Sequence, residues 1–217
     1  MTGEPVDTVT VLETRGPLAT KRITWAEGEP TPRIEAYARA AHFHFVEFNL
    51  SGPDELVQLL HLLEQRPKRL IVRGKPKPGI EGTIARRLIR DRRNGDGSIT
   101  PATLEACPHY WIALDCDRVP CPNGINPLFE PRAAVEHVVS TLPLEFQGAT
   151  CWWQFTASQG FKPGISLRLF FWADRRVADW ELKLWLAGSS VDHAIFEPDD
   201  RLIEDGDLFA FDGAAQV

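Results

Sequence analysis

Two aspartates near the end of an apolar run are the residues best suited to chemistry in this sequence. The run Tyr110 to Asp117 (YWIALDCD) predicts a strand, and Asp115 and Asp117 occupy alternate positions near its end. Residues two apart on a strand point to the same face and lie about 7 Å apart. Two carboxylates held so close repel each other unless a cation lies between them, and Mg²⁺ favours a few carboxylates together with substrate phosphates. The pair therefore predicts a divalent-cation site, with solvated turn carboxylates as the alternative.

Further polar residues could complete such a site. Asp192 is a third acid beside a short apolar segment, and Ser166 and Arg168 share one face of a predicted strand. A guanidinium beside three carboxylates is what a metal-bound triphosphate requires. Lys162 precedes that strand in a predicted loop and could add positive charge. The alternative for Arg168 is a surface arginine on an amphipathic strand.

Cysteine and histidine offer a competing metal site. The candidates for a zinc site are Cys107, His109, Cys116 and Cys121. Their spacings match no pair of Cys-x₂-Cys motifs, which argues against zinc. Four cysteines are also too few for a disulfide scaffold in 217 residues, so we expect a reducing, cytoplasmic setting.

The chemistry-bearing residues must be positioned by the predicted strands and helices. These elements alternate in the first half of the chain, and the second half contains a hairpin. Strands are predicted at residues 9–11, 42–50, 69–73, 110–117, 150–158, 165–172 and 192–196, the 110–117 strand being expected at the centre of its sheet. Helices are predicted at residues 53–63, 83–92, 131–142 and 177–186. The strands at 150–158 and 165–172 are close enough to form a hairpin. This pattern predicts an α/β fold of the α+β kind, with a mixed sheet and helices against it.

Composition excludes several classes of protein. The chain of 217 residues is 43% hydrophobic and 25% charged, which is ordinary globular usage and excludes a disordered chain, a fibre or a coiled coil. No apolar run approaches the roughly 20 residues that span a bilayer. The N-terminus lacks the basic and apolar regions of a signal peptide. We therefore expect a cytoplasmic protein without a membrane partner, built as a single domain over residues 1–217.

The acidic net charge of −6 conceals a strongly basic segment. Between Arg66 and Arg93 there are 11 lysines and arginines and only two acids, so the segment carries +9 and the rest of the chain −15. Such a segment could hold a polyanion without the whole protein being basic. The residues expected to bind nucleic acid are Arg73, Lys75, Arg86, Arg87 and Arg90. A solvated charged face is the alternative.

The order of these motifs resembles the catalytic core of the archaeo-eukaryotic primase superfamily, especially the primase-polymerases of phages and plasmids. An apolar strand ends in Asp-x-Asp, a hairpin follows with KPGISLRLFFW, and after a helix comes VDHAIFEP. The resemblance covers roughly residues 8–205. It implies an RRM-like catalytic sheet over residues 106–217 and a smaller N-terminal α/β part over residues 1–105.

The resemblance also implies site residues and an activity. Asp115, Asp117 and Asp192 match the metal-binding triad, so Mg²⁺ or Mn²⁺ is the expected cofactor. Ser166 and Arg168 match the Ser-x-His motif that binds the incoming nucleotide, with arginine in place of histidine, and Lys162 and Ser158 are expected to assist. The activity implied is template-dependent nucleotidyl transfer by a DNA primase or polymerase. Single-stranded DNA, (d)NTPs and a replicative helicase are the expected partners.

Two further functions remain open from the sequence. A nucleic-acid-binding or replication-initiation module could keep the fold and lack turnover, as the exchange of histidine for Arg168 suggests. A metal-dependent nuclease is the other, because three carboxylates with two metal ions also hydrolyse phosphodiesters.

Overall fold

The computed structural model describes residues 6–16, 18–35, 42–80, 90–157, 159–187 and 208–210. It has an α+β fold, and all pairings between its named strands are antiparallel. The α+β class predicted from the sequence is confirmed. The mixed sheet is not, because these pairings are all antiparallel; the described strands form two main sheets and three short two-stranded ribbons.

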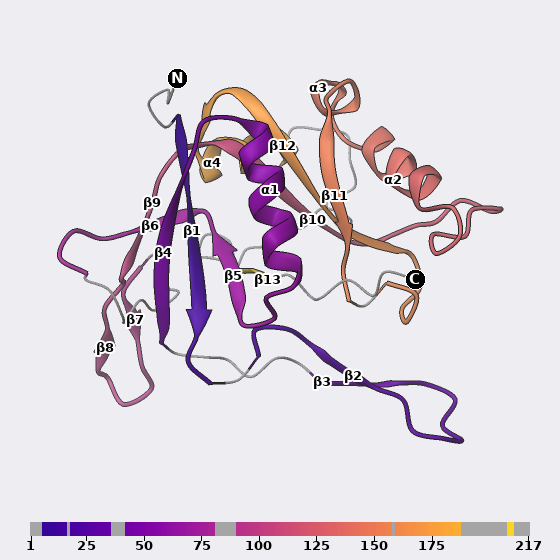
Figure 1. Cartoon of the computed structure of the whole chain (residues 1–217), viewed down its shortest axis with the longest axis horizontal. Coiled ribbons are helices and arrows are strands. Elements are labelled where there is room, and N and C mark those ends of the chain that lie inside the picture. The colour runs from indigo at the N-terminus through magenta and orange to yellow at the C-terminus, as the bar shows by residue number, and fades with distance from the viewer. Residues whose placement is uncertain are drawn as a thin grey trace.

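The first main sheet has the order β13-β5-β1-β4. Its strands are β1 (Asp7–Thr14), β4 (Phe43–Leu50), β5 (Arg69–Val72) and β13 (Leu208–Ala210). Helix α1 (Pro53–Glu64) follows β4 and lies beside this sheet in Figure 1. Its buried residues are Leu56, Leu59, Leu60 and Leu63, the helical stripe that the sequence predicts.

The second main sheet has the order β10-β12-β11. Its strands are β10 (His109–Val119), β11 (Cys151–Phe155) and β12 (Ile165–Val177). The prediction that β10 is central is wrong for the described residues, since β12 holds that place. Strand β10 reads as a continuous apolar run because both of its faces are buried, Ile112 and Leu114 in one core cluster and Trp111 and Ala113 in another.

Helices cover one face of the second sheet. They are α2 (Pro131–Ser140), α3 (Leu144–Gln147) and α4 (Asp179–Ala187). Val135, Phe146 and Leu182 pack from these helices into the cluster that contains Leu167 and Leu169 of β12. This layer leaves the opposite face of the sheet to meet the N-terminal part of the chain.

A shared core cluster joins the two main sheets. Trp111, Ala113 and Phe170 of the second sheet pack with Val9 of β1 and Leu60 of α1. The same face of the second sheet turns polar further along, at Asp115, Arg168 and Gln154, as the strand register shows. The fold therefore places one polar row next to an apolar contact between the sheets.

Three antiparallel ribbons complete the described structure, and the sequence patterns missed them. They are β2 (Arg22–Thr24) with β3 (Arg33–Glu35), β6 (Gly74–Pro76) with β9 (Leu104–Ala106), and β7 (Arg92–Arg93) with β8 (Ile99–Thr100). The β2–β3 ribbon projects from the body at the lower right of Figure 1. The helix predicted at 83–92 is wrong at its end, because Arg92 is in β7. Most of that helix and the strand predicted at 192–196 lie outside the described residues.

No helix in the described part of the chain is long and apolar enough to cross a bilayer.

Candidate functional site

Asp115 and Asp117 lie on the same strand, at the end of β10 where its pairing becomes irregular. The register with β12 shifts between Cys116 and Val119, and Arg118 has a positive φ of 57°. Cys116 between the two acids is fully buried in the helix-covered core. Because neighbours on a strand point to opposite faces, the two carboxylates project away from that core. Asp117 is exposed and Asp115 partly so.

The loop between β11 and β12, together with the first residues of β12, holds this irregular end in place. The backbone N–H of Arg118 donates to Ser166 Oγ at 3.0 Å, and the N–H of Ser166 donates to Gln159 Oε1 at 2.6 Å. Ser166 is buried, so its hydroxyl acts on the turn after Asp117. Gly164 has φ 87°, and a Cβ there would lie 2.8 Å from the Val119 carbonyl oxygen. Only glycine fits this close approach without a shift of backbone.

Arg168 lies directly across from Asp115 in the β10–β12 register. Its Nε is 3.4 Å from Asp115 Oδ1, and the two side chains are 10% and 32% exposed. On the other side of Arg168, the β11–β12 register places Gln154. The three residues form a row across the sheet, here called the polar row, which leads from solvent at Asp115 to the interior at Gln154.

The donor set is compatible in part with a divalent cation. Asp115 and Asp117 supply the oxygen ligands that Mg²⁺ and Mn²⁺ prefer. Asp192, the expected third ligand, lies outside the described residues, and within the described ranges no three His, Cys, Asp or Glu side chains are grouped for a metal. The zinc alternative is not assembled either, because Cys116 is in the core and Cys121 Sγ contacts the Ile125 carbonyl oxygen at 3.3 Å. Burial, and next the charges of Asp115 and Asp117, raise the pKa of Cys116, which stays a thiol.

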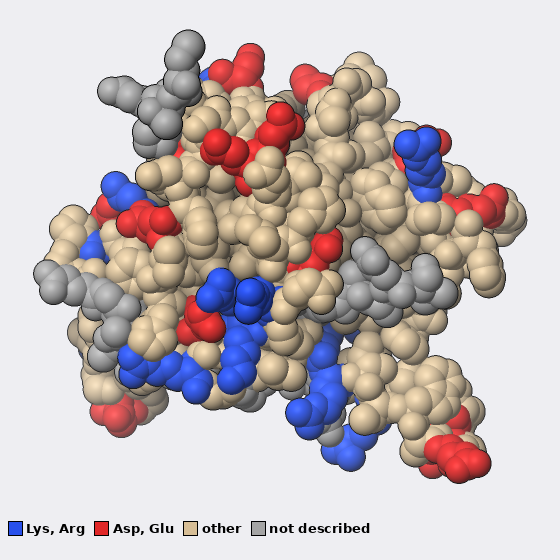
Figure 2. Space-filling model, viewed as in Figure 1, with Lys and Arg blue, Asp and Glu red and all other residues tan. Residues whose placement is uncertain are grey.

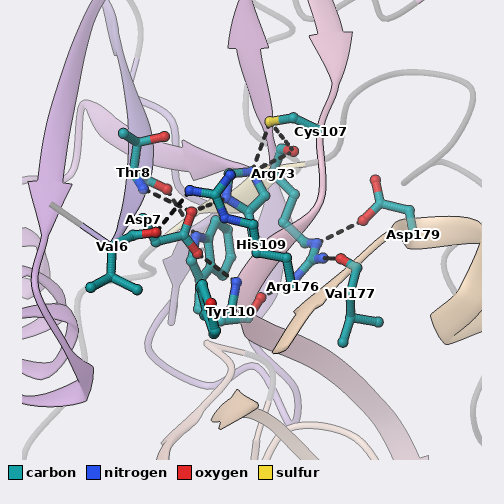
Figure 3. Close-up of polar contacts among 11 residues, drawn as sticks. Val6, Asp7, Thr8, Arg73, Cys107, His109, Tyr110, Arg176, Val177 and Asp179 are labelled. Carbon is teal, nitrogen blue, oxygen red and sulfur yellow. Dashed lines mark hydrogen bonds and ion pairs between the residues drawn. The ribbon is translucent and has the colours of Figure 1, made fainter. Parts of the chain in front are cut away.

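The assignment of Arg73 to a nucleic-acid surface is wrong. Its side chain is 3% exposed, and its guanidinium points toward Asp179 and Val177, as Figure 3 shows. Nε is 2.7 Å from Asp179 Oδ1, Nη2 donates to the Val177 carbonyl at 2.8 Å, and Nη1 donates to the Trp111 carbonyl. Because the guanidinium is buried and all three of its nitrogens are engaged within the fold, it is not accessible to a phosphate, so Arg73 is a structural residue.

A Cys-His-Asp cluster adjoins Arg73 (Figure 3). His109 Nδ1 is 2.9 Å from Asp7 Oδ1, and Nε2 is 3.1 Å from both Cys107 Sγ and the Arg73 carbonyl oxygen. The arrangement has the order of a thiol-nucleophile triad. However, burial raises the pKa of Cys107 to about 11, against the lowering effect of Lys75, so the thiol is protonated near neutral pH. The Arg73 carbonyl oxygen can only accept a hydrogen bond, so Nε2 donates its hydrogen there and cannot also take a proton from the Cys107 thiol. The cluster therefore serves to join strands.

Asp7 anchors this cluster through three contacts of its carboxylate. Besides His109, its carboxylate accepts hydrogen bonds from the backbone N–H groups of Thr8 at 2.8 Å and Tyr110 at 2.5 Å. Burial raises the pKa of Asp7, but the hydrogen bond and charge of His109 and the two backbone donors together lower it below its usual value. The ionised carboxylate therefore ties β1 to the start of β10.

The other predicted binding residues fall into three groups. Lys75 is exposed and paired with Glu105 at 3.1 Å, which raises the pKa of Lys75. Lys162 and Arg90 are exposed. Outside the described residues lie Ser158, Arg86 and Arg87. The structure thus brings together Asp115, Arg168 and Ser166 of the predicted set, with Asp117 on the same strand as Asp115.

Gln154 and Thr156 are site residues that the sequence analysis missed. Both are buried. Gln154 is on β11 opposite Arg168, and Thr156 directly follows the end of β11 and donates its N–H to the Ser166 carbonyl. The signal was present in the sequence, because Gln154 is the single polar residue in the run Cys151–Phe155 (CWWQF). A glutamine inside an aromatic strand indicates a buried amide that needs a partner.

Comparison with family models, with curated proteins and with solved structures finds no significant match to this chain.

Proposed function

We propose that this protein is a template-dependent nucleotidyltransferase that joins nucleotides on single-stranded DNA, using divalent metal ions. The observation that supports this best is the register of β10 and β12, which sets Asp115 directly opposite Arg168. A carboxylate that can hold a cation and a guanidinium that can hold a phosphate are then neighbours on one sheet face. The order of motifs that resembles the primase superfamily supports the choice of nucleotides as substrates.

Asp115 and Asp117 would hold the metal, together with Asp192. When bound, the metal neutralises charge on the reacting and leaving phosphate oxygens. Arg168 would hold the polyphosphate, and Ser166 keeps the strand end that carries Asp117 in position through its bond to the Arg118 N–H. Gly164 allows the backbone approach on which that geometry depends.

A basic edge outside the polar row supports single-stranded DNA as the template. The turn that carries exposed Arg66 and Lys68 is bonded to the end of β1, through Thr14 N–H to the Lys68 carbonyl at 3.0 Å and Ala19 N–H to the Pro67 carbonyl at 2.8 Å. This brings the turn next to Arg15. Figure 2 shows lysine and arginine side chains gathered along the lower part of this face. We call the surface of Arg15, Arg66 and Lys68 the basic edge.

The test is a product analysis with primed and unprimed single-stranded DNA, (d)NTPs, and Mg²⁺ or Mn²⁺. Extended or newly made strands that require the metal are the expected result. Shortened template strands would instead identify a nuclease. Template binding with neither product would contradict the proposal and leave a binding module.

That binding module is the second candidate, and one observation favours it. Arg168 Nε lies 3.4 Å from Asp115 Oδ1, so a fixed positive charge already stands next to the carboxylate that would bind the metal. If the pair stays closed, it replaces the cation with a guanidinium. The protein would then bind nucleic acid through the basic edge without turnover.

A further inference from the structure

Gln154 has an environment that differs from those of Gln147 and Gln159. It is 5% exposed, and neither its Oε1 nor its Nε2 has a hydrogen-bond partner in the part of the chain that the structure describes. By contrast, Gln159 Oε1 accepts from the Ser166 N–H at 2.6 Å, and Gln147 Nε2 donates to the Leu142 carbonyl at 2.7 Å. The amide of Gln154 is thus buried without a hydrogen bond in the described part of the chain, while those of Gln147 and Gln159 bond to the backbone.

The surroundings of Gln154 give no packing reason for an amide. Two residues earlier on the same face, Trp152 packs edge-on against Phe170 at 5.4 Å between ring centroids. A leucine at position 154 would extend this apolar contact without leaving polar atoms unbonded. Burying an amide without a partner is costly, and such groups in folded proteins call for an explanation such as a ligand.

The place of Gln154 in the polar row indicates where its partner comes from. It lies one strand beyond Arg168 and two strands beyond Asp115, and adjacent strands are about 4.8 Å apart. Its face is therefore shared with the groups proposed to hold the metal and the polyphosphate. A ligand that extends along the row past Arg168 reaches Gln154.

We propose that Gln154 is a specificity-determining residue whose amide hydrogen-bonds the nucleoside part of the substrate. This inference rests on the proposed function. The chemistry of the amide selects the nucleoside over the phosphates, because Oε1 requires a hydrogen-bond donor and an ionised phosphate has none. A sugar hydroxyl, or a base edge with a donor beside an acceptor, satisfies Oε1 and Nε2 together.

Thermal unfolding without ligand is the first arm of the test. Gln154→Leu removes the unbonded amide, so its Tm is expected to rise by roughly 2–10 °C. Gln159→Leu is the matched control, and its Tm should fall because the buried Ser166 N–H loses its acceptor. A fall in Tm for Gln154→Leu would overturn the inference, since it would mean that the amide is already bonded within the fold.

Binding is the second arm, with single (d)NTPs and inorganic tripolyphosphate as probes in the presence of Mg²⁺. Gln154→Leu should weaken (d)NTP binding by about tenfold or more and leave tripolyphosphate binding unchanged. Arg168→Ala should weaken both. A ribose-specific loss identifies a sugar hydroxyl as the partner, and a base-specific loss identifies a base edge.

The two failures are distinguishable. Equal binding of (d)NTPs by the parent and by Gln154→Leu overturns the role of Gln154 and leaves the proposed function standing. An equal loss for tripolyphosphate assigns the amide to phosphate and also overturns it. A parent protein that binds neither probe refutes the proposed function, and this inference with it.

Discussion

Replacing Arg73 should lower the stability of the protein far more than its place in a basic segment suggests. Arg73→Met removes a guanidinium that pairs with Asp179 at 2.7 Å and donates to the Val177 and Trp111 carbonyls. Arg73 Cζ also lies 5.1 Å from the Trp111 ring centroid. The variant keeps an apolar side chain of similar length, so the loss is mainly electrostatic.

The size of the effect follows from what remains after the substitution. Asp179 has a side chain only 14% exposed and would lose its ion-pair partner, and two carbonyls would lose a charged donor. Removing one partner of a buried ion pair costs about 3–5 kcal/mol. For a chain of this size that corresponds to a fall in Tm of roughly 6–20 °C. Arg73→Lys keeps the charge but lacks the planar fork, so its loss should be intermediate.

Urea unfolding and DNA binding measured on the same variants decide the matter. Arg66→Met is the matched control, since Arg66 is exposed in the same basic segment and its loss should change stability by less than about 0.5 kcal/mol. A nucleic-acid contact at Arg73 would give the reverse pattern. If Arg73→Met is within 1 kcal/mol of the parent and binds DNA weakly, the assignment of Arg73 as a structural residue is refuted.

Three further results are expected. Gly164→Ala should destabilise the protein by about 1–3 kcal/mol in urea unfolding and reduce activity, because the new Cβ would meet backbone atoms at a φ of 87°. Gly124→Ala is the control: this glycine also has a positive φ but open space around it, so the substitution should cost less stability and spare activity. Folding lowers the pKa of Asp7, so its stabilising effect is full above the unfolded pKa of about 3.9 and is lost as pH falls through the folded pKa. The difference in urea midpoint between the parent and Asp7→Asn should therefore shrink below about pH 4, and a constant difference would contradict this. Binding to single-stranded DNA should weaken with salt, with a log–log slope near −3 if about four phosphates are neutralised, and Arg66→Gln with Lys68→Gln should make that slope shallower; an unchanged slope would exclude the basic edge.

Local patterns predicted much of the secondary structure because the signals were short in range. The leucine spacing in α1, Pro131 at the start of α2, and the paired apolar runs of β11 and β12 each reflect contacts within one element or between neighbours. That Asp115 and Arg168 lie on one face of the sheet could be anticipated from strand alternation and motif order. That they lie directly opposite each other in the strand register could not.

What could not be predicted depends on contacts far apart in the sequence. Arg73 reads as one more charge in a basic run, because its carboxylate partner lies 106 residues away at Asp179. The apolar run of β10 indicated burial on both faces, but periodicity does not tell a central strand from an edge strand packed on both sides. The ribbons were missed because strands of two or three residues carry too few positions to show alternation.

Nucleotide incorporation by Asp115→Asn with Asp117→Asn, measured beside the parent on a primed single-stranded template with Mn²⁺ or Mg²⁺, tests the central claim most directly. Asparagine keeps the size of each side chain and removes the charges that would hold the metal. The account predicts incorporation by the parent and a fall of several powers of ten in the variant, because the charge stabilisation by the metal is worth several kcal/mol, with the urea midpoint close to that of the parent. Incorporation at the parental rate by the folded double variant would contradict the assignment of Asp115 and Asp117 as the metal-binding carboxylates of a nucleotidyltransferase.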